Sequence, residues 1–239
     1  MADLGDPGAH LRQAVHEANR ALVEAGLVTL SFGNASAIDR EAGVIVIKPS
    51  GVPYDRMTPA DMVTVAVDGG RPIGGDLRPS SDTPTHLALY RHYPDIGGVV
   101  HTHSPFASAW AQAGREIPCL GTTHADHFAG PVPVSRPMTD GEIGGEYERE
   151  TGEVIAETLD RLGMEPLSMP AVLVASHGPF TWGRDAAEAV MNAIALEAVA
   201  ALAYRTFALE PNVGAIGEAL RQRHFRRKHG PSAYYGQER

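Results

Sequence analysis

One apolar segment that ends in two histidines constrains this chain more than any other feature. The segment is GGVVHTHS, residues 97–104. Side chains two residues apart on an extended strand point to the same face, so His101 and His103 would project side by side from the end of a buried strand. Neutral imidazoles suit zinc and its neighbours, and two of them form half of a divalent metal site. The alternative is a pair of ordinary histidines that bond to the backbone.

A third histidine and one acidic residue are candidates to complete such a site. The apolar segment AVLVASHG, residues 171–178, also runs into a histidine, His177. The sequence contains no HExxH motif, which argues against a zincin peptidase. If the two strands are neighbours in one sheet, three imidazoles converge. Asp82, at a loop–helix junction, is the best acidic partner for the remaining charge. The alternatives are a strand-end histidine that bonds locally and an aspartate that caps a helix.

Three short loops have the composition of an oxyanion site. They are GNAS at 33–36, KPSG at 48–51 and RPSSD at 78–82. Glycine permits close backbone approach, Ser and Asn supply hydrogen-bond donors, and Lys48 adds positive charge. Each loop is also a good ordinary turn. Because neither GxxxxGK[ST] nor GxGxxG occurs, the loops do not indicate a nucleotide site.

Bulk properties exclude several classes of protein. At 239 residues the chain suits one domain, and its net charge of −9 argues against nonspecific binding to nucleic acid or an anionic membrane. The single cysteine, Cys119, allows no intrachain disulfide and no thiolate metal cluster. We find no signal peptide at the N-terminus and expect no apolar run of membrane-spanning length, so a cytoplasmic location is expected.

Hydrophobic periodicity predicts one α/β domain with mixed strand directions. Helices are expected over 11–25, 139–162 and 185–208, the last with a capping-box-like start at Asp185. Strands are expected at LVTLS (27–31), VIVI (44–47), MVTVAVD, GGVVH and AVLVASH, with GNAS as a turn after the first of them.

Two further segments carry side chains suited to proton transfer. Asp126 lies in GTTHADHF, where it is either a general acid/base or an ordinary loop carboxylate. Tyr234 and Tyr235 end the chain in YYGQ and, taken alone, would be packing residues. The basic run from Arg221 to Lys228 is most simply a solvated helix face or a contact with an acidic neighbouring subunit.

Taken together, the ordered motifs resemble the class II sugar-phosphate aldolase family. They are GNAS, KPSG, PSSDTPTHLALY, GGVVHTHS, GTTHADHF, GEYERETGEVI, AVLVASHGPFTWG and YYGQ, and they span about residues 10–237. Within the family, Asp82 in PSSD, Asp126 in TTHAD and the terminal YYG resemble the branch that epimerises L-ribulose 5-phosphate. The resemblance implies a single domain over 1–239 with a central mixed, largely antiparallel sheet flanked by helices.

The resemblance also implies roles for particular residues. His101, His103 and His177 match the family's zinc ligands, Asp82 matches the fourth metal-site residue, and Mn²⁺ or Co²⁺ could replace zinc. Asp126 and Tyr235 match its acid/base pair. Residues that match its substrate and phosphate loops or line the same pocket are Gly33, Asn34, Lys48, Ser50, Gly51, Ser80, Ser81, Thr122 and His224.

The activity implied is metal-dependent epimerisation of L-ribulose 5-phosphate to D-xylulose 5-phosphate at C4, in arabinose or ascorbate catabolism. It would proceed by retro-aldol cleavage of C3–C4, rotation of the aldehyde and re-addition. The rivals are an aldolase of the same fold acting on L-fuculose 1-phosphate or a related ketose phosphate, and a metal-binding protein without catalysis. The resemblance further implies a homotetramer in which the C-terminal tail, about residues 211–239, contributes to a neighbouring subunit's site.

Overall fold

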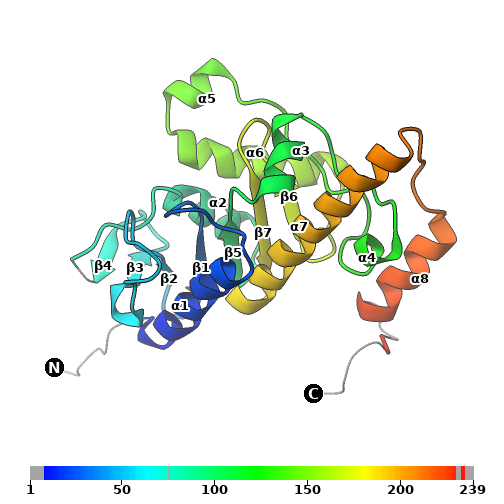
Figure 1. Cartoon of the computed structure of the whole chain (residues 1–239). Coiled ribbons are helices and arrows are strands. Elements are labelled where there is room, and N and C mark those ends of the chain that lie inside the picture. The colour runs from blue at the N-terminus through cyan, green and yellow to red at the C-terminus, as the bar shows by residue number, and fades with distance from the viewer. Residues whose placement is uncertain (1–7, 75, 230–232, 235–239) are drawn as a thin grey trace.

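A seven-stranded sheet forms the centre of the molecule in the computed structural model, which describes residues 8–74, 76–229 and 233–234 (Figure 1). The strand order is β4-β3-β2-β1-β5-β7-β6, and every pairing between these strands is antiparallel. The α/β class and the largely antiparallel sheet are therefore confirmed. The strands are β1 (Asn34–Asp39), β2 (Val44–Ile47), β3 (Val63–Ala66), β4 (Pro72–Gly74), β5 (Gly98–His101), β6 (Ala171–Leu173) and β7 (Pro179–Gly183).

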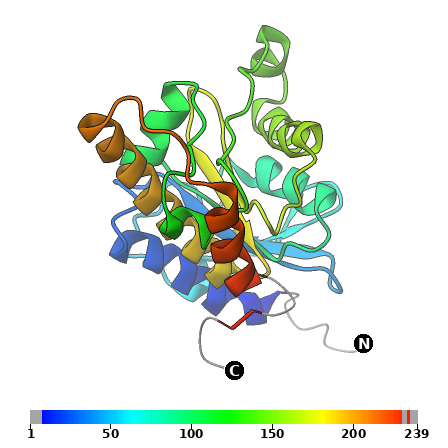
Figure 2. The same cartoon turned by 90° about the vertical axis from the view of Figure 1, so that its right-hand side faces the viewer.

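Helices cover both faces of the sheet (Figure 2). On one face lie α1 (Ala9–Glu24) and the first half of α7 (Ala186–Leu209), and on the other lie α2 (Thr83–His92) and α6 (Tyr147–Leu162). The remaining helices are the 3-10 helix η1 (Pro59–Asp61), α3 (Pro105–Gln112), α4 (Thr122–Ala125), α5 (Asp140–Gly144) and α8 (Glu218–His229).

The alternation of side chains along the strands produces two buried apolar clusters. Ala35 and Val46 face α1 and α7, whereas Ile45 and Val99 face α2 and α6, so successive residues of one strand serve opposite faces. The start of α7 follows the prediction, because the Asp185 carboxylate accepts a hydrogen bond from the Glu188 amide at 2.8 Å.

The first predicted strand is wrong. Residues 27–33 form a loop, and β1 begins at Asn34 inside the segment expected to be a turn. Two conformational features explain the shift: Leu30 has a left-handed backbone (φ 56°), and the Tyr54 hydroxyl donates to the Gly33 carbonyl at 2.8 Å. The apolar residues of the segment therefore do not continue into the sheet.

Two other predicted elements are divided by turns. The strand expected to run to His177 ends at Leu173, and His177 lies in the turn to β7, where Ser176 has φ 60°. The helix expected over 139–162 is two helices, α5 and α6, separated at Gly145, whose backbone (φ −99°, ψ −129°) is not helical. The histidine is thus presented by a hairpin and not by the strand itself.

The expectation that no apolar run reaches membrane-spanning length is wrong, because helix α7 reaches it. By length and composition it is apolar enough to cross a bilayer, with a mean hydropathy of 1.6 over its best window. Half of that window is buried inside the protein, against β5 and β7. This pattern is typical of a core helix whose apolar side packs against the rest of the protein.

Candidate metal and phosphate site

Three histidines converge at the end of β5. His101 is the last residue of that strand, His103 follows it by two residues, and His177 comes from the β6–β7 turn. One ring nitrogen of each lies within 4.8 Å of the others. His101 is buried, His177 is half-buried and His103 is exposed, so the cluster opens to solvent on one side. The convergence predicted from sequence is confirmed as geometry.

Close backbone approach brings the third histidine to the other two. A Cβ at Gly178 would lie 2.8 Å from the Thr102 carbonyl oxygen, so only glycine lets the hairpin sit this near to β5. From the next strand, the Phe180 ring stacks on the His101 ring with centroids 4.2 Å apart. The residues next to His177 in the chain therefore fix its place against His101.

The ring orientations suit metal coordination. His101 Nδ1 donates to the Pro179 carbonyl at 3.0 Å, which leaves Nε2 unprotonated and 3.1 Å from Nε2 of His103. The Tyr147 hydroxyl lies 3.5 Å from Nδ1 of His177. Metal-binding histidines usually bond through their other ring nitrogen in this way, because the bond fixes the tautomer.

Burial keeps two rings of the cluster, those of His101 and His177, uncharged. It lowers the pKa of His101 to about 3 and lowers the pKa of His177, so both rings are neutral at pH 7. Burial alone would raise the pKa of Asp82, but the neighbouring His101 and His86 and the hydrogen bond from Asn34 outweigh it and lower that pKa. Neutral imidazoles beside an ionised carboxylate fit a divalent cation.

Asp82 does not serve as a helix cap. It occupies the N-cap position of α2 but makes no side-chain capping bond. Its Oδ2 instead accepts a hydrogen bond from Asn34 Nδ2 at 2.5 Å, and the same amide nitrogen lies 3.1 Å from Ser80 Oγ. The helix-capping alternative is therefore not supported, since the carboxylate is directed toward β1 and the triad.

The three candidate phosphate loops lie against one another. The Ser50 amide donates to the Arg78 carbonyl and the Ser80 amide donates to the Lys48 carbonyl, both at 2.9 Å. Gly33, which precedes Asn34 in the chain, has φ 82° and leaves no space for a Cβ, since one would lie 2.8 Å from the His101 carbonyl. These contacts bring together the loop residues Gly33, Asn34, Lys48, Ser50, Gly51, Ser80 and Ser81 beside the triad.

Lys48 supplies a buried cation to these loops. It is 2% exposed, and its Nζ lies over the Tyr54 ring at 4.7 Å. Burial lowers the pKa of its ammonium group, while the Asp82 carboxylate opposes that shift. A lysine held this way is a positive charge available to an anion that replaces the lost hydration.

A second polar cluster forms around Asp126, at the end of α4. Arg227 of α8 binds the carboxylate through both oxygens, with Nε 2.8 Å from Oδ1 and Nη2 2.5 Å from Oδ2. His224 Nδ1 lies 3.0 Å from Oδ1. Burial would raise the pKa of Asp126, but the bonds from Arg227 and His224 lower it. Thr122 begins the same short helix.

One subunit does not bring the two clusters together. Figure 1 shows α4 and α8 side by side at the right-hand end of the molecule, whereas β5 and β7 lie at its centre. The charged groups that act on Asp126 belong to α8, and those that act on Asp82 belong to the triad and α2. Tyr235, the other acid/base candidate, lies outside the described residues.

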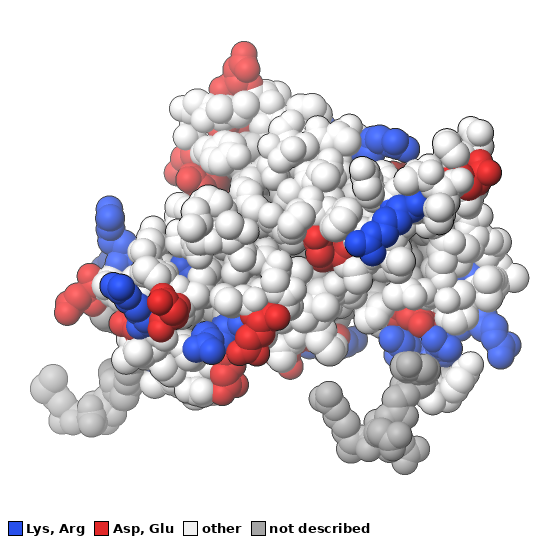
Figure 3. Space-filling view, viewed as in Figure 1, with Lys and Arg blue, Asp and Glu red and all other residues white. Residues whose placement is uncertain are grey.

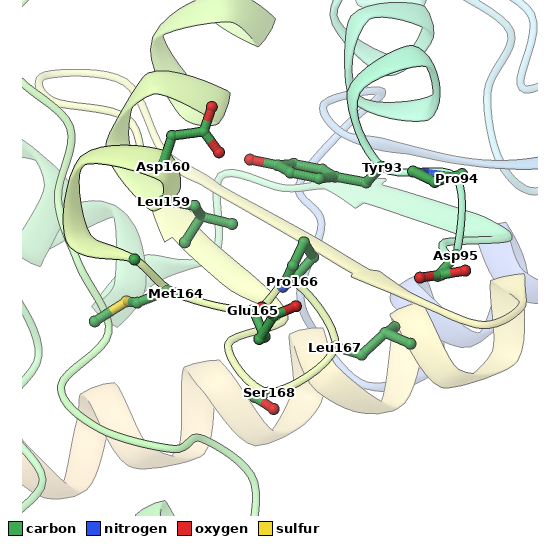
Figure 4. Close-up of a pocket in the computed structure, with 11 residues that line it drawn as sticks. Tyr93, Pro94, Asp95, Leu159, Asp160, Met164, Glu165, Pro166, Leu167 and Ser168 are labelled. Atoms are coloured by element: carbon green, nitrogen blue, oxygen red, sulfur yellow. The ribbon is translucent and has the colours of Figure 1, made fainter.

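Cavities lie beside the phosphate loops and elsewhere. One of about 610 Å³ is lined by Ser80, Ser81 and Glu148, next to the loops. Another of the same volume lies between α2 and the end of α6, where the Tyr93 hydroxyl points toward the Asp160 carboxylate (Figure 4). None of the three histidines lines either cavity, so the candidate site is placed by the triad and the adjoining loops and not by a cavity.

Two residues of these clusters were not anticipated. Tyr147 belongs to the motif GEYERETGEVI, but the sequence predicted no site role for it. Arg227 was predicted only as part of the basic run. Helical spacing offered one signal, since Arg227 follows His224 by three residues and therefore shares its face of α8. Tyr147 had no such signal, because its partner His177 is thirty residues away.

Comparison with known proteins gives a consistent family. Residues 13–204 match the model of the class II aldolase and adducin N-terminal domain. Relatives named L-ribulose-5-phosphate 4-epimerase UlaF, from Salmonella paratyphi A and Salmonella typhi, are each 55% identical over 227 residues, which cover 95% of this chain and 98% of the relative.

Solved structures show the same fold. A putative aldolase/epimerase/decarboxylase, YgbL from Escherichia coli, superimposes with a TM-score of 0.70 at 26% identity, covering 91% of this chain and 99% of that one. An L-fuculose 1-phosphate aldolase gives a TM-score of 0.70 at 22% identity, covering 90% and 94%. At that identity the second likeness concerns the fold alone.

Proposed function

The chain belongs to the class II aldolase family, and we propose that it converts L-ribulose 5-phosphate into D-xylulose 5-phosphate. The observation that carries the proposal is the 55% identity, over nearly the full length of both chains, to relatives named L-ribulose-5-phosphate 4-epimerase. The arrangement of the triad and the phosphate loops supports it, since a phosphorylated sugar needs both a cation site and an anion site.

In this proposal His101, His103 and His177 hold the metal, with Asp82 as the fourth metal-site residue and Zn²⁺ as the ion. A bound divalent ion supplies Lewis-acid stabilisation of the negative charge that develops on substrate oxygens. The chain's own contribution is the orientation of the His101 ring by the Pro179 carbonyl and the uncharged state of that ring, which burial maintains.

The phosphate loops hold the part of the substrate that moves. The hydrogen on C4 is not adjacent to the carbonyl group, so removing that hydrogen cannot invert C4. Cleavage and re-formation of the C3–C4 bond can invert it. The resulting aldehyde must rotate without leaving. We assign its retention to Lys48, to the Ser50–Gly51 turn and to Ser80 and Ser81, because these residues lie on loops that contact one another beside the triad and carry a buried cation and hydroxyl groups.

Asp126 and Tyr235 are proposed to transfer protons at the C4 hydroxyl, one on each face of the aldehyde. Asp126 lies apart from the triad of its own subunit and is bound to α8. We therefore propose that α4, α8 and the tail over about 211–239, with Thr122, His224 and Tyr235, serve the pocket of a neighbouring subunit in a homotetramer. Two copies would then be needed for one complete site.

The outer surface of α7 supports assembly. Met191, Leu202 and Leu209 lie on one side of α7 and are all about half exposed or more, and charged groups interrupt this surface near the middle of the helix (Figure 3). Apolar side chains gathered on one surface are typical of a face that another protein covers. In the proposed tetramer, copies of the same chain cover it.

The test is a coupled assay on the purified protein. With L-ribulose 5-phosphate as substrate, we expect D-xylulose 5-phosphate to form, and we expect prior dialysis against a chelator to abolish its formation. Elemental analysis of the same sample should give about one divalent ion per subunit. Efficient cleavage of L-fuculose 1-phosphate without epimerisation would overturn the proposal in favour of the aldolase alternative.

A further inference from the structure

A buried polar chain beneath Asp82 has no part in the proposed mechanism. His86 is fully buried, and its Nδ1 lies 2.7 Å from Ser36 Oγ. Ser36 Oγ in turn lies 2.8 Å from the Tyr90 hydroxyl. The chain joins α2 to β1 inside the core, where polar groups are retained only if they are paired.

One polar atom in this chain of hydrogen bonds has no partner. Nε2 of His86 is buried and has no hydrogen-bond partner among the described residues. The ring is neutral, because burial lowers the pKa of His86 to about 4. A neutral imidazole bonded through one nitrogen still offers a donor or an acceptor at the other, and leaving that atom unpaired in the interior is unfavourable.

The unpaired nitrogen belongs to a ring beside the metal site. His86 follows Asp82 by four residues, so the two share one face of α2, and the His86 amide donates to the Asp82 carbonyl at 3.1 Å. The Asp82 carboxylate acts electrostatically on the His86 ring, and His86 acts on Asp82 in return. The His86 ring also meets Phe180 edge-on at 6.2 Å, and Phe180 stacks on His101.

We propose that His86 is a positioning residue for the Asp82 carboxylate: its Nε2–H donates to that carboxylate when the metal site is loaded. The Tyr90 hydroxyl donates to Ser36, and the Ser36 hydroxyl donates to Nδ1 of His86, which keeps the proton on Nε2. The inference rests on the proposed place of Asp82 in the metal site. Ligand carboxylates are commonly held this way, and their outer partners tune the affinity of the metal.

The test measures metal binding and not turnover. Cobalt(II) is titrated into the apoprotein while its visible absorption is recorded, which reports both affinity and coordination. We expect His86→Phe, which keeps a ring against Phe180 but removes both nitrogens, to weaken cobalt binding about 10- to 100-fold and to change the spectrum. Ser36→Ala, which leaves the ring but frees its tautomer, should weaken binding less.

A control and a double variant separate positioning from general damage. Tyr93→Phe also removes a buried polar atom near α2, since the Tyr93 hydroxyl bonds the Ala156 carbonyl at 3.3 Å. It should lower stability without changing cobalt affinity. If His86 acts through Asp82, then Asp82→Asn combined with His86→Phe binds cobalt no more weakly than Asp82→Asn alone.

Several results would overturn the inference. One is an unchanged cobalt affinity and spectrum in His86→Phe. Another is a double variant in which the losses of cobalt affinity add fully, as expected if His86 serves only core packing or binds a buried water. If His86→Phe does not fold, unchanged binding by Ser36→Ala and by His86→Gln has the same meaning. Wild-type cobalt binding by Asp82→Asn would instead remove Asp82 from the metal site, and with it both this inference and that part of the proposed function.

Discussion

The two polar clusters of this chain differ in how complete they are. The triad and its loops are built from the centre of the sheet, and the His101 ring is already oriented by the Pro179 carbonyl. The cluster around Asp126 lies at one end of the subunit, and its carboxylate is bonded to Arg227 and His224 of its own chain. The first cluster combines a possible cation site with the candidate phosphate loops, whereas the second, among the described residues, holds Asp126 with the pocket candidates Thr122 and His224 but no metal-binding triad.

The comparison indicates a division of labour. In the proposed function, one folded chain binds the metal and the phosphate, since the triad and the three loops lie together within it. Proton transfer is proposed to depend on groups that the chain presents away from its own triad. The variants below test this division, beginning with the largest expected effect.

Loss of a metal ligand should have the largest effect. His103 is exposed, so His103→Ala removes an imidazole without opening a cavity in the core. We expect bound metal to fall to a small fraction and epimerase activity to fall at least about 1000-fold, because Lewis-acid stabilisation is lost with the ion. Elemental analysis checks the first and the coupled assay the second. A full complement of metal would contradict ligation by His103.

Loss of the acid/base carboxylate should leave the first cluster intact. We expect Asp126→Asn to keep its metal and to lose about 100- to 10,000-fold in kcat, the range typical of a general acid or base. Thermal unfolding serves as the control, because the Arg227 bond to the carboxylate is also weakened. Unchanged turnover would remove Asp126 from the mechanism.

Replacement of Arg227 should raise the pKa of Asp126. Arg227 and His224 hold the pKa of Asp126 below its usual range. In Arg227→Gln that pKa should rise, so the acid limb of the kcat profile should shift to higher pH, with a smaller loss of kcat, about tenfold at neutral pH. Arg223→Gln, in the same basic helix, is the matched control. An unmoved acid limb in Arg227→Gln would show that Asp126 does not limit the profile.

Acid should destabilise the apoprotein through its buried histidines. Burial lowers the pKa of His101 to about 3 and that of His86 to about 4, from the ordinary histidine value of about 6.5. Between these values the unfolded state binds more protons than the folded state, so stability is complete above about pH 6.5 and falls as the pH decreases. From pH 6.5 to 5 we expect a loss of up to roughly 2 kcal/mol per buried histidine, measured by urea unfolding. A flat profile over this range would contradict the neutral state of His101 and His86.

The sequence predicted the first cluster well for a physical reason. The two-residue spacing keeps His101 and His103 close together even though β5 ends at His101, and the loop residues are close to their strand ends in the chain. The strand at 27–31 failed, because apolar composition does not report a left-handed residue such as Leu30. The position of His177 also depended on a turn that the apolar run concealed.

The second cluster was less predictable because its contacts are distant in the chain. Asp126 and Arg227 are 101 residues apart, and no local pattern relates them. His86 was invisible for the same reason, since Ser36 is fifty residues away from it. The resemblance drew attention to Asp126 and Tyr235, but only the fold shows that α4, which ends at Asp126, lies away from β5 in its own subunit.

Complementation between two inactive variants tests the shared site most directly. His103→Ala lacks the metal half and Asp126→Asn lacks the proton-transfer half, so neither assembly is active alone. When the two chains are produced together in equal amounts and mix at random in a head-to-tail ring, about a quarter of the sites combine two intact halves. We predict recovery of about that fraction of wild-type activity. No recovery in mixed assemblies that are shown to contain both chains would contradict the account, and would place Asp126 in the site of its own subunit.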